Sequence, residues 1–298
     1  MARLLRWLAG WPLAWLHRLG GPVGWLAYGL SPTYRARFIA NARQAGLSPG
    51  QYRPAIAAAG RMLMELPPLW LRPAGQPLAM PVEWRGAELI AAAHARGRGI
   101  LFLTPHLGCF EVTAQSYAER FAPRFGAITV LYRPPRKDWL RPLVDSARRR
   151  PNLAAAPATL AGVRQMIRAL RGGEAVGLLP DQVPPEGLGV WAPFFGKPAY
   201  TMTLAVRLLQ QTGAVPLAVW GERLPAGAGY VVHVSAIDEA HPADAPQAES
   251  AAAVNRVMER LIRGRPQQYL WGYHRYKAPA RTSAAARAAP DGSGPVGG

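Results

Sequence analysis

Two short loops hold the residues whose types could carry chemistry. One loop contains His106 and Glu111, and the other contains Asp181. A carboxylate bonded to one imidazole nitrogen fixes the tautomer and stabilises the imidazolium, which leaves the second nitrogen available as a base. This combination suits removal of a proton from an alcohol that attacks a thioester. We therefore predict that His106 and Glu111 form a general-base pair, with a ring nitrogen and a carboxylate oxygen within or near hydrogen-bonding distance.

The spacing of His106 and Glu111 restricts how the two side chains could meet. Residues five positions apart on one continuous helix lie about 140° from a whole number of turns, so their side chains could not face each other there. A turn at His106, eased by Gly108, would let the first turn of a following helix bring Glu111 beneath the imidazole. Spacing alone leaves open a second interpretation, in which the histidine caps the helix and the glutamate is an unrelated surface residue.

The apolar segments before these loops predict the elements that position them. Residues 99–103 and 175–179 are continuous apolar runs, which are typical of strands buried on both faces of a sheet. In open α/β sheets, functional groups gather at the carboxyl ends of such strands. We therefore expect His106 and Asp181 on the same edge of the sheet.

Strand and helix patterns alternate along most of the chain. This alternation predicts an α/β fold with a mostly parallel central sheet covered by helices. Residues 180–198 are rich in proline and glycine and are expected to form a loop. Strands are expected at 82–85, 99–103, 127–132, 153–156, 175–179, 215–220 and 230–234, and helices at 51–72 (closing on Pro67-Pro68 and Pro73), 87–95, 111–120, 138–149, 160–171, 202–212 and 252–263.

Positive charge is concentrated near the amino terminus. The 298-residue chain has a formal net charge of +18, and no acidic residue precedes Glu65. The same segment holds eight arginines interleaved with tryptophan and leucine, a mixture typical of an anionic membrane surface; nucleic-acid-binding arms are basic but poor in leucine. We expect two short amphipathic helices lying in the membrane interface, interrupted at Gly20-Gly21-Pro22, and no nucleic acid partner. The alternative is a basic helix packed on its own domain.

Composition also divides the chain. We expect membrane-associating helices at 1–45 and a catalytic domain at 46–277. Residues 278–298 lack a periodic apolar face and are expected to be disordered. The single cysteine, Cys109, cannot form an intrachain disulfide, which is typical of a protein from a reducing compartment.

Several enzyme signatures are missing from the sequence. No Gly-x-Ser-x-Gly occurs, which argues against a lipase or thioesterase with a serine nucleophile. Gly196-Lys197 lacks the other residues of a P-loop, and no Gly-x-Gly-x-x-Gly follows a strand, which argues against a nucleotide-binding protein. The remaining histidines have no repeated ligand spacing, so we assign no metal and no cofactor.

The segment from His106 to Glu111 resembles the His-x4-Asp/Glu motif of the lysophospholipid acyltransferase superfamily. Further blocks, in the same order, resemble the bacterial branch that adds secondary (lauroyl- or myristoyl-type) acyl chains to lipid A, in which the motif typically ends in glutamate. These blocks are Leu131-Tyr132-Arg133-Pro134, Arg148-Arg149-Arg150, Gly173-Glu174, Leu179-Pro180-Asp181-Gln182, Pro193-Phe194-Phe195-Gly196, Gln268-Tyr269-Leu270-Trp271 and Arg275-Tyr276-Lys277.

The resemblance implies a role for each matched residue. His106 looks like the general base, and Glu111 looks like its orienting partner. Arg148 looks like the essential arginine of the Arg-x-Arg block, although Pro151 departs from the family's Arg-x-Arg-x-Gly pattern and leaves the register open by one or two residues. Asp181 looks like the essential aspartate of its block, with the orientation of Arg148 or another cation as its expected role. Arg133 is expected to be a second phosphate contact.

The resemblance also implies partners and a location. The donor would be the thioester of an acyl carrier protein or coenzyme A, and the acceptor a hydroxyl of a lipid A precursor. The reaction would take place at the cytoplasmic face of the bacterial inner membrane. Another glycolipid or an aminolipid, such as a mannosylated phosphoinositide or an ornithine lipid, is the alternative acceptor. A non-enzymatic basic membrane-binding protein is the remaining alternative, but it would not explain why His106, Glu111 and Asp181 follow apolar strands.

Overall fold

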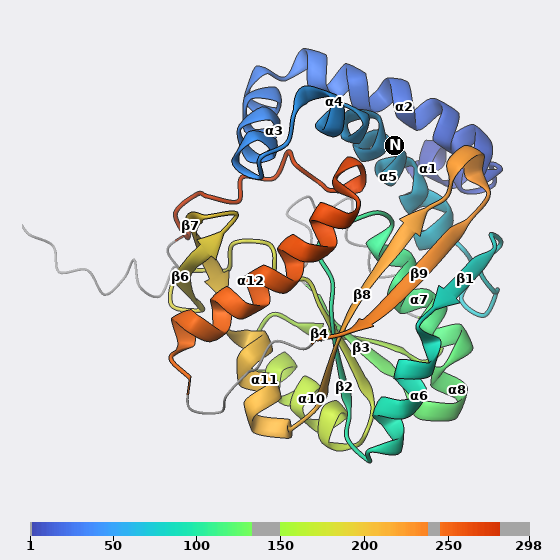
Figure 1. The fold of residues 1–298 in the computed structure, drawn as a ribbon. Coiled ribbons are helices and arrows are strands. Elements are labelled where there is room, and N and C mark those ends of the chain that lie inside the picture. The colour runs from blue at the N-terminus through green and yellow to red at the C-terminus, as the bar shows by residue number, and fades with distance from the viewer. Residues whose placement is uncertain (1, 133–149, 238–244, 281–298) are drawn as a thin grey trace, which may run out of the picture.

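The computed structural model describes residues 2–132, 150–237 and 245–280 (Figure 1). Its centre is a seven-stranded sheet with the order β1-β9-β8-β2-β5-β3-β4, and β6 pairs with β7 in a separate hairpin. Neighbouring strands of the large sheet are parallel except for β8 and β9. The predicted fold class is therefore confirmed. The strands are β1 (Val82–Arg85), β2 (Ile100–Leu103), β3 (Ile128–Tyr132), β4 (Leu153–Pro157), β5 (Ala175–Leu178), β6 (Gly189–Phe194), β7 (Lys197–Met202), β8 (Val215–Arg223) and β9 (Tyr230–Ala236).

Helices cover both faces of the sheet, and a group of amino-terminal helices lies at one end of it (Figure 1). The helix at 51–72 was expected to close on Pro67-Pro68, but it continues through both prolines to Trp70. The expected helix at 138–149 lies outside the described residues. The helices are α1 (Ala2–Ala9), α2 (Leu13–Leu30), α3 (Pro32–Gln44), α4 (Pro49–Tyr52), α5 (Pro54–Trp70), α6 (Ala87–Ala95), α7 (Phe110–Arg120), α8 (Ala122–Phe125), α10 (Leu160–Arg171), α11 (Leu204–Thr212) and α12 (Gln247–Gly264), with short 3-10 turns η2 (Pro225–Gly227) and η3 (Pro266–Gln268).

The β2 strand shows why the centre of this sheet is apolar at every position. Ile100 and Phe102 belong to a buried cluster that includes side chains of α6, α7 and α8. Leu101 and Leu103 belong to a second cluster with side chains of α10, α11 and α12. Successive side chains of a strand point to opposite faces, so a strand covered on both sides needs an apolar residue at each position.

The segment 180–198 was expected to be a loop, but it contains β6 and the start of β7. The two strands meet at a two-residue turn, in which Phe195 has φ +47° and Gly196 has φ +74°. Both values suit the hairpin turns that require positive φ at both central residues. Phe195 adopts this unfavourable conformation because the rest of the fold holds it: its N–H donates to Glu259 at 2.7 Å, and its carbonyl accepts from Gln44 at 2.7 Å.

The amino-terminal helices separate at a different point from the predicted one. The break falls between Ala9 and Leu13, and α2 continues through Gly20-Gly21-Pro22, so the predicted interruption there was wrong. Close packing on α5 accounts for this. A Cβ added to Gly24 would lie 2.1 Å from the carbonyl oxygen of Ile56, which leaves room only for glycine. Backbone-to-backbone contact along the crossing of α2 and α5 offsets the hydrogen bond that Pro22 cannot donate.

Large apolar side chains remain exposed on α1 and α2. Trp7 is 59% exposed, Trp15 55% and Trp25 47%, and Leu4, Leu19, Leu26 and Leu30 are exposed with them. The guanidinium of Arg18 lies 5.0 Å from the centroid of the Trp15 ring. Among the residues that the structure describes, no helix is both long and apolar enough to cross a membrane. The predicted division of the chain at residues 45 and 277 stays a prediction.

Candidate active site

The predicted chemical residues gather at the carboxyl ends of two adjacent strands. The β2 and β5 strands are parallel neighbours, with Leu103 opposite Leu178. His106 follows the end of β2, and Asp181 follows the end of β5. The expectation that the two residues share one edge of the sheet is therefore confirmed. Strand order decides this, because the carboxyl ends of parallel neighbours lie side by side.

The imidazole of His106 is hydrogen-bonded at both nitrogens. Nδ1 lies 2.7 Å from Oδ1 of Asp181, and Nε2 lies 3.0 Å from Nε2 of Gln182. An ionised carboxylate only accepts hydrogen bonds, so the fitting tautomer carries its proton on Nδ1 and accepts from Gln182 at Nε2. The side chain of His106 is 17% exposed. Nε2 is therefore a proton acceptor covered by one displaceable amide.

Asp181 is buried and surrounded by donors. Its side chain is 2% exposed, and its Oδ2 accepts from the backbone N–H of His106 at 2.9 Å and from the hydroxyl of Tyr269 at 3.2 Å. Burial alone would raise the pKa of Asp181, but the facing imidazole and the hydrogen bonds from His106 lower it below the ordinary value. The carboxylate thus stays ionised and fixes both the ring and the backbone of His106.

The loop around His106 is held by contacts to distant segments. Gly108 has φ +60°, and a Cβ there would lie 1.9 Å from the carbonyl oxygen of Gly221. The amide of Gly108 donates to the carbonyl of Gln268, and Leu270 donates to the carbonyl of His106. Because the 268–270 segment also supplies the Tyr269 hydroxyl, it fixes His106 and its carboxylate partner together.

Glu111 takes a different position from the predicted one. It is buried in the first turn of α7, with 6% of its surface exposed. The hydrogen-bond partners of the His106 ring are Asp181 and Gln182, and Glu111 is not one of them in the described chain. The carboxylate hydrogen-bonded to the His106 ring is thus that of Asp181, at the end of β5, and the role of Glu111 in orienting His106 stays a prediction.

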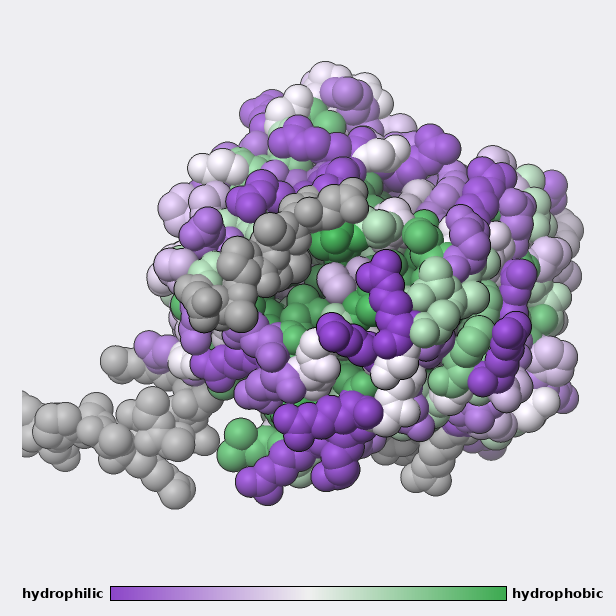
Figure 2. Space-filling model, turned by 60° about the horizontal axis from the view of Figure 1, so that its bottom comes forward, coloured by the Kyte–Doolittle hydropathy of each residue, from purple (hydrophilic) through white to green (hydrophobic). Residues whose placement is uncertain are grey.

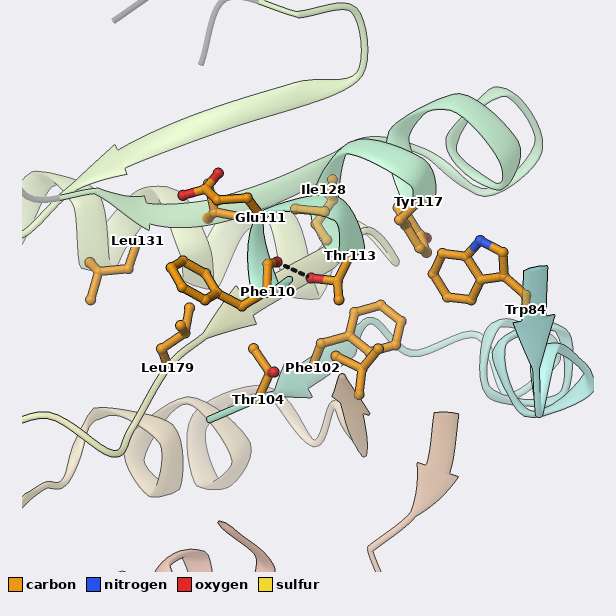
Figure 3. Close-up of a pocket in the computed structure, with 14 residues that line it drawn as sticks. Trp84, Phe102, Thr104, Phe110, Glu111, Thr113, Tyr117, Ile128, Leu131 and Leu179 are labelled. Carbon is orange, nitrogen blue, oxygen red and sulfur yellow. Dashed lines mark hydrogen bonds between the residues drawn. The ribbon is translucent and has the colours of Figure 1, made fainter. Parts of the chain in front are cut away.

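An apolar pocket opens beside Glu111, between α7 and the sheet (Figure 3). Glu111 and Thr104 are the polar residues at one end, and Trp84 and Tyr117 lie at the other. In another view, Figure 2, apolar residues line a hollow bordered by polar ones. The remaining pocket residues are Phe102, Phe110, Thr113, Ala114, Ile128, Val130, Leu131, Gly177, Leu179 and Val219.

Comparison with known proteins identifies the family. The model for the bacterial lipid A biosynthesis acyltransferase family matches residues 4–278. The chain belongs to this family. It is an acyltransferase.

Three relatives give the extent of the similarity. The acyltransferase is 31% identical over 223 residues to a lipid A biosynthesis lauroyltransferase of Escherichia coli K12. This matched segment covers 73% of the present chain and 69% of the relative. It is 28% identical over 193 residues to a lipid A biosynthesis palmitoleoyltransferase of the same organism, covering 64% and 60%. A Shigella flexneri lipid A biosynthesis acyltransferase 2 is 26% identical over 198 residues, covering 64% and 59%. The matched segments thus span between 59% and 69% of these relatives.

Three arginines of the acyltransferase lie in or near the blocks that carried the family resemblance. Arg133 and Arg148 lie outside the described residues. Arg150, from the same cluster, is buried. Its guanidinium donates to the carbonyl oxygen of Leu69 in the last turn of α5 at 2.7 Å and to that of Arg72, just beyond the helix, at 3.1 Å. A cation at these carbonyls stabilises the end of a helix. Burial, together with the charge of Arg72, lowers the pKa of Arg150 to about 10.

A second buried ionic group contacts the loop that carries His106. Glu65 of α5 accepts from Nε and Nη2 of Arg223 at 2.5 and 2.6 Å and from Nε2 of His17 at 2.7 Å. Arg223 also donates to the carbonyl of Gly108 at 3.3 Å. Burial would raise the pKa of Glu65, but Arg223 and then His17 lower it to about 2. The group therefore ties α2, α5 and β8 to the loop that carries His106.

Cys109 lies in this loop and is fully enclosed, with 2% of its surface exposed. Burial raises the pKa of its thiol well above the ordinary value. A thiolate is the reactive form of cysteine, so this environment suppresses nucleophilicity.

Three residues of this region had no predicted role. Tyr269 and Gln182 stand in blocks that carried the family resemblance, and their place in those blocks was the available signal. Arg223 had no such signal, because its partner Glu65 is 158 residues away in the sequence.

Proposed function

We propose that this acyltransferase moves a fatty acyl chain from the thioester of an acyl carrier protein or coenzyme A to a hydroxyl of a lipid A precursor. The observation that carries the proposal is the geometry of His106, with Nδ1 fixed by a buried carboxylate and Nε2 covered by one amide. The names of the relatives support lipid A as the acceptor. The net charge of +18 would favour docking of an acidic carrier protein.

The reaction would be a single displacement. The substrate hydroxyl replaces the Gln182 amide at Nε2 and gives its proton to that nitrogen as its oxygen bonds to the thioester carbonyl carbon. Asp181 stabilises the resulting imidazolium. The tetrahedral intermediate then collapses, the carbon–sulfur bond breaks, and the imidazolium returns the proton to the departing thiolate. An ester and a thiol leave, and His106 is again neutral.

The other acidic and basic residues have supporting roles in this proposal. Glu111, from the family motif, would add negative charge that favours the imidazolium. Arg148 would bind a substrate anion or the developing oxyanion, and Arg133 would contact a substrate phosphate.

The apolar pocket between α7 and the sheet would hold the acyl chain. Gly177 lines it, and a Cβ there would lie 3.4 Å from Val130, an ordinary contact that narrows the pocket without a clash. We expect Gly177→Ala to shift donor preference towards shorter chains. Gly264→Ala is the matched control, because no atom lies within 4 Å of an added Cβ there. Competition assays with donors of different chain length measure the shift. An unchanged chain-length preference would contradict binding of the acyl chain in this pocket.

The exposed tryptophans of α1 and α2 support an interfacial contact with the cytoplasmic face of the bacterial inner membrane. Deleting α2 would remove His17, a hydrogen-bond partner of the buried Glu65, so point substitutions are the better test. Trp15→Gln together with Trp25→Gln should weaken binding to anionic vesicles at least about tenfold, because each exposed indole would bury apolar surface worth roughly 1.5–3 kcal/mol. Sedimentation with vesicles measures this, and unchanged binding would contradict the interfacial helices.

The deciding experiment is acyl transfer by the purified full-length protein. Labelled acyl carrier protein and acyl-coenzyme A donors are offered with three acceptors: a lipid A precursor, another glycolipid and an ornithine-type aminolipid. We expect transfer to the lipid A precursor, analysed by mass spectrometry. Transfer only to another acceptor would contradict the lipid A precursor as the acceptor and identify that lipid in its place. Membrane binding without any transfer would leave the non-enzymatic alternative.

A further inference from the structure

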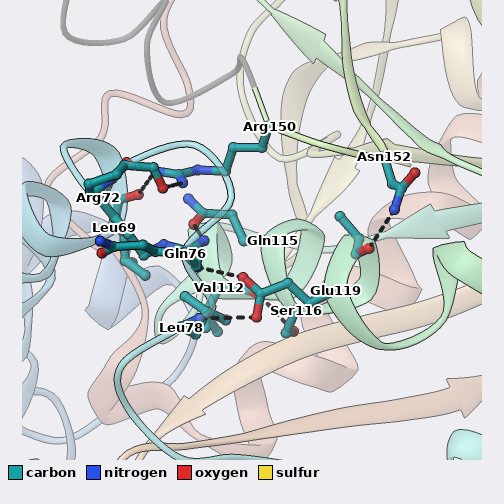
Figure 4. A network of polar contacts seen from close by, with 12 residues as sticks. Leu69, Arg72, Gln76, Leu78, Val112, Gln115, Ser116, Glu119, Arg150 and Asn152 are labelled. Carbon is teal, nitrogen blue, oxygen red and sulfur yellow. Dashed lines mark hydrogen bonds and ion pairs between the residues drawn. The ribbon is translucent and has the colours of Figure 1, made fainter.

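A second pocket lies on the outer side of α7, away from the apolar pocket. Its rim is exposed and includes Gly75, Glu119 and Asn152, whereas its floor contains buried polar side chains. Three of these are more than nine-tenths buried: the side chain of Arg72 is 7% exposed, Gln115 is 1% exposed and Arg150 is 9% exposed. Figure 4 shows the side chain of Gln115 between those of Arg72 and Arg150.

Within the part of the chain that the structure describes, each of these three side chains keeps one buried donor without a hydrogen-bond partner. The atoms are Nε of Arg72, Nε2 of Gln115 and Nε of Arg150. Their other polar atoms are bonded: Arg72 donates to Oε1 of Gln115 at 3.0 Å and pairs with Glu119 at 2.5 Å. Most buried polar groups in folded proteins are hydrogen-bonded, because an unpartnered donor is costly, so three in one pocket are unusual.

The charges of the pocket are also unbalanced. Arg72 and Arg150 contribute two positive charges, and Glu119 on the rim contributes one negative charge. Glu119 is already engaged, because its second oxygen accepts from the backbone N–H of Leu78 at 3.1 Å. The two guanidinium groups disfavour each other, and burial with the charge of Arg72 lowers the pKa of Arg150 to about 10. Glu111 also acts on Arg150 through its negative charge, but among the described residues that line the pocket the positive charges exceed the negative by one, beside three N–H donors.

We propose that this pocket binds a phosphate group, with Arg72, Gln115 and Arg150 as its donors. A phosphate has several acceptor oxygens and no need of a donor, and guanidinium groups are its preferred protein partners. Phosphate groups occur both in lipid headgroups and in soluble phosphopantetheine-type compounds, and the pocket fits the chemistry that they share. The proposal does not depend on acyl transfer.

The test observes the unpartnered donors directly. The Nε–H signals of Arg72 and Arg150 are followed by ¹H–¹⁵N NMR in the full chain, and Arg72→Lys and Arg150→Lys assign them. We expect both signals to shift saturably with inorganic phosphate and to stay unchanged with chloride at equal ionic strength. Phosphate should also raise the melting temperature of the protein.

Substitutions at Gln115 separate the site from general attraction to a basic protein. Gln115→Glu places a negative charge between the two arginines, so the melting temperature should rise without phosphate and phosphate affinity should fall at least about tenfold. Gln115→Met removes the amide donors at similar size and should also weaken phosphate binding. Arg98→Gln, at a basic surface on another part of the molecule, is the matched control and should bind phosphate like the wild type.

Three results would overturn the proposal. They are Nε–H signals that do not shift with phosphate, an unchanged phosphate affinity of folded Gln115→Glu protein, or a loss of phosphate affinity in Arg98→Gln as large as in the Gln115 variants. Two further probes distinguish the source of the group. A response to phosphatidic acid vesicles but not to phosphatidylcholine vesicles assigns the pocket to a lipid headgroup. A response to pantetheine 4′-phosphate assigns it to a soluble donor, and either response supports the site.

Discussion

Two histidine–carboxylate pairs in this protein have the same length but different surroundings. The nitrogen–oxygen distance is 2.7 Å in both His106–Asp181 and His17–Glu65. In the first pair, the histidine side chain is 17% exposed and sits on a loop; in the second, it is 5% exposed and sits on α2. The length of the hydrogen bond therefore does not distinguish the two histidines.

The third partner of each pair makes the difference. Glu65 is neutralised by Arg223 through two hydrogen bonds, so its charge is already balanced without the histidine. Asp181 accepts from Tyr269 and from a backbone amide, both of them neutral donors. The charge of Arg275 also lowers the pKa of Asp181, although its guanidinium is not hydrogen-bonded to this carboxylate in the described chain. The second nitrogen of His106 faces the amide of Gln182. The two pairs therefore differ in the partner bonded to the carboxylate, an arginine for Glu65 and neutral donors for Asp181, and in the exposure of the histidine.

The largest expected effect is on catalysis at His106. His106→Ala removes the base and should lower the acyl-transfer rate by about 10²–10⁴-fold. Asp181→Asn leaves a poorly oriented imidazole and should lose a comparable factor, and the double variant should be little worse, because the pair acts as one unit. Steady-state assays with a labelled thioester donor measure these rates, and circular dichroism checks folding.

The matched control for these variants is Cys109→Ala in the same loop. Direct transfer needs no thiol, so its rate should stay close to wild type. An inactive but folded Cys109→Ala protein, or an acyl group trapped on this cysteine, would replace the single displacement with a covalent mechanism. Glu111→Ala adds a second comparison: a rate loss as large as that of Asp181→Asn would show that two carboxylates serve one histidine.

The next largest effect is on stability, at the other pair. Glu65→Gln leaves Arg223 buried without its counter-ion, which should cost about 3–5 kcal/mol of the free energy of unfolding. The rate of the remaining folded protein should fall less than about tenfold, because His106 and Asp181 are untouched. Urea unfolding and activity per folded molecule separate the two quantities. If Glu65→Gln lost activity at unchanged stability, the His17–Glu65 pair would also serve catalysis. The assignment of a stabilising role to that pair would then be wrong.

A pH series sharpens the same contrast. The pKa of Glu65 is about 2 in the folded protein against an ordinary value of 4.5, so its carboxylate stabilises the fold above pH 4.5. That contribution is lost as the pH falls from 4.5 through 2, and it amounts to about 3 kcal/mol in total. Asp181, whose pKa is also lowered, contributes with the same sign. Wild-type stability should therefore fall more steeply below pH 4.5 than that of Glu65→Gln; equal slopes would mean that Glu65 is not the group that titrates.

The contrast between the pairs also marks what sequence patterns can predict. The apolar runs at 99–103 and 175–179 predicted two buried strands, and their carboxyl ends predicted the edge that carries His106 and Asp181. These are local patterns, and they were sufficient because each strand needs apolar residues on both faces. The family blocks added the order of the chain and the identity of the motif.

The partner of His106 could not be predicted in the same way. It depends on the adjacency of β2 and β5, which a pattern within one strand does not encode, whereas Glu111 was assigned from its place in the His-x4-Asp/Glu motif. Glu65 and Arg223 are harder still, because they lie 158 residues apart and meet only after α5 packs on the sheet. The turn at Phe195 was missed because its positive φ is stabilised by tertiary hydrogen bonds and not by its own residue type.

The smallest expected effect concerns Gln182, the amide that covers Nε2 of His106 at 3.0 Å. Gln182→Ala removes a hydrogen bond whose net value is about 0.5–1.5 kcal/mol, so activity should change by less than about tenfold. A hydroxyl that no longer competes with the amide should bind no more weakly, and KM should stay the same or fall. Gln182→Glu is the opposing variant: its carboxylate would compete for Nε2 and favour a protonated imidazole that cannot act as a base, so kcat should fall well below that of Gln182→Ala. Steady-state kinetics of both variants measure the split between kcat and KM. If Gln182→Ala lost as much rate as His106→Ala, the amide itself would take part in the chemistry, and Nε2 would not be the open side of this pair.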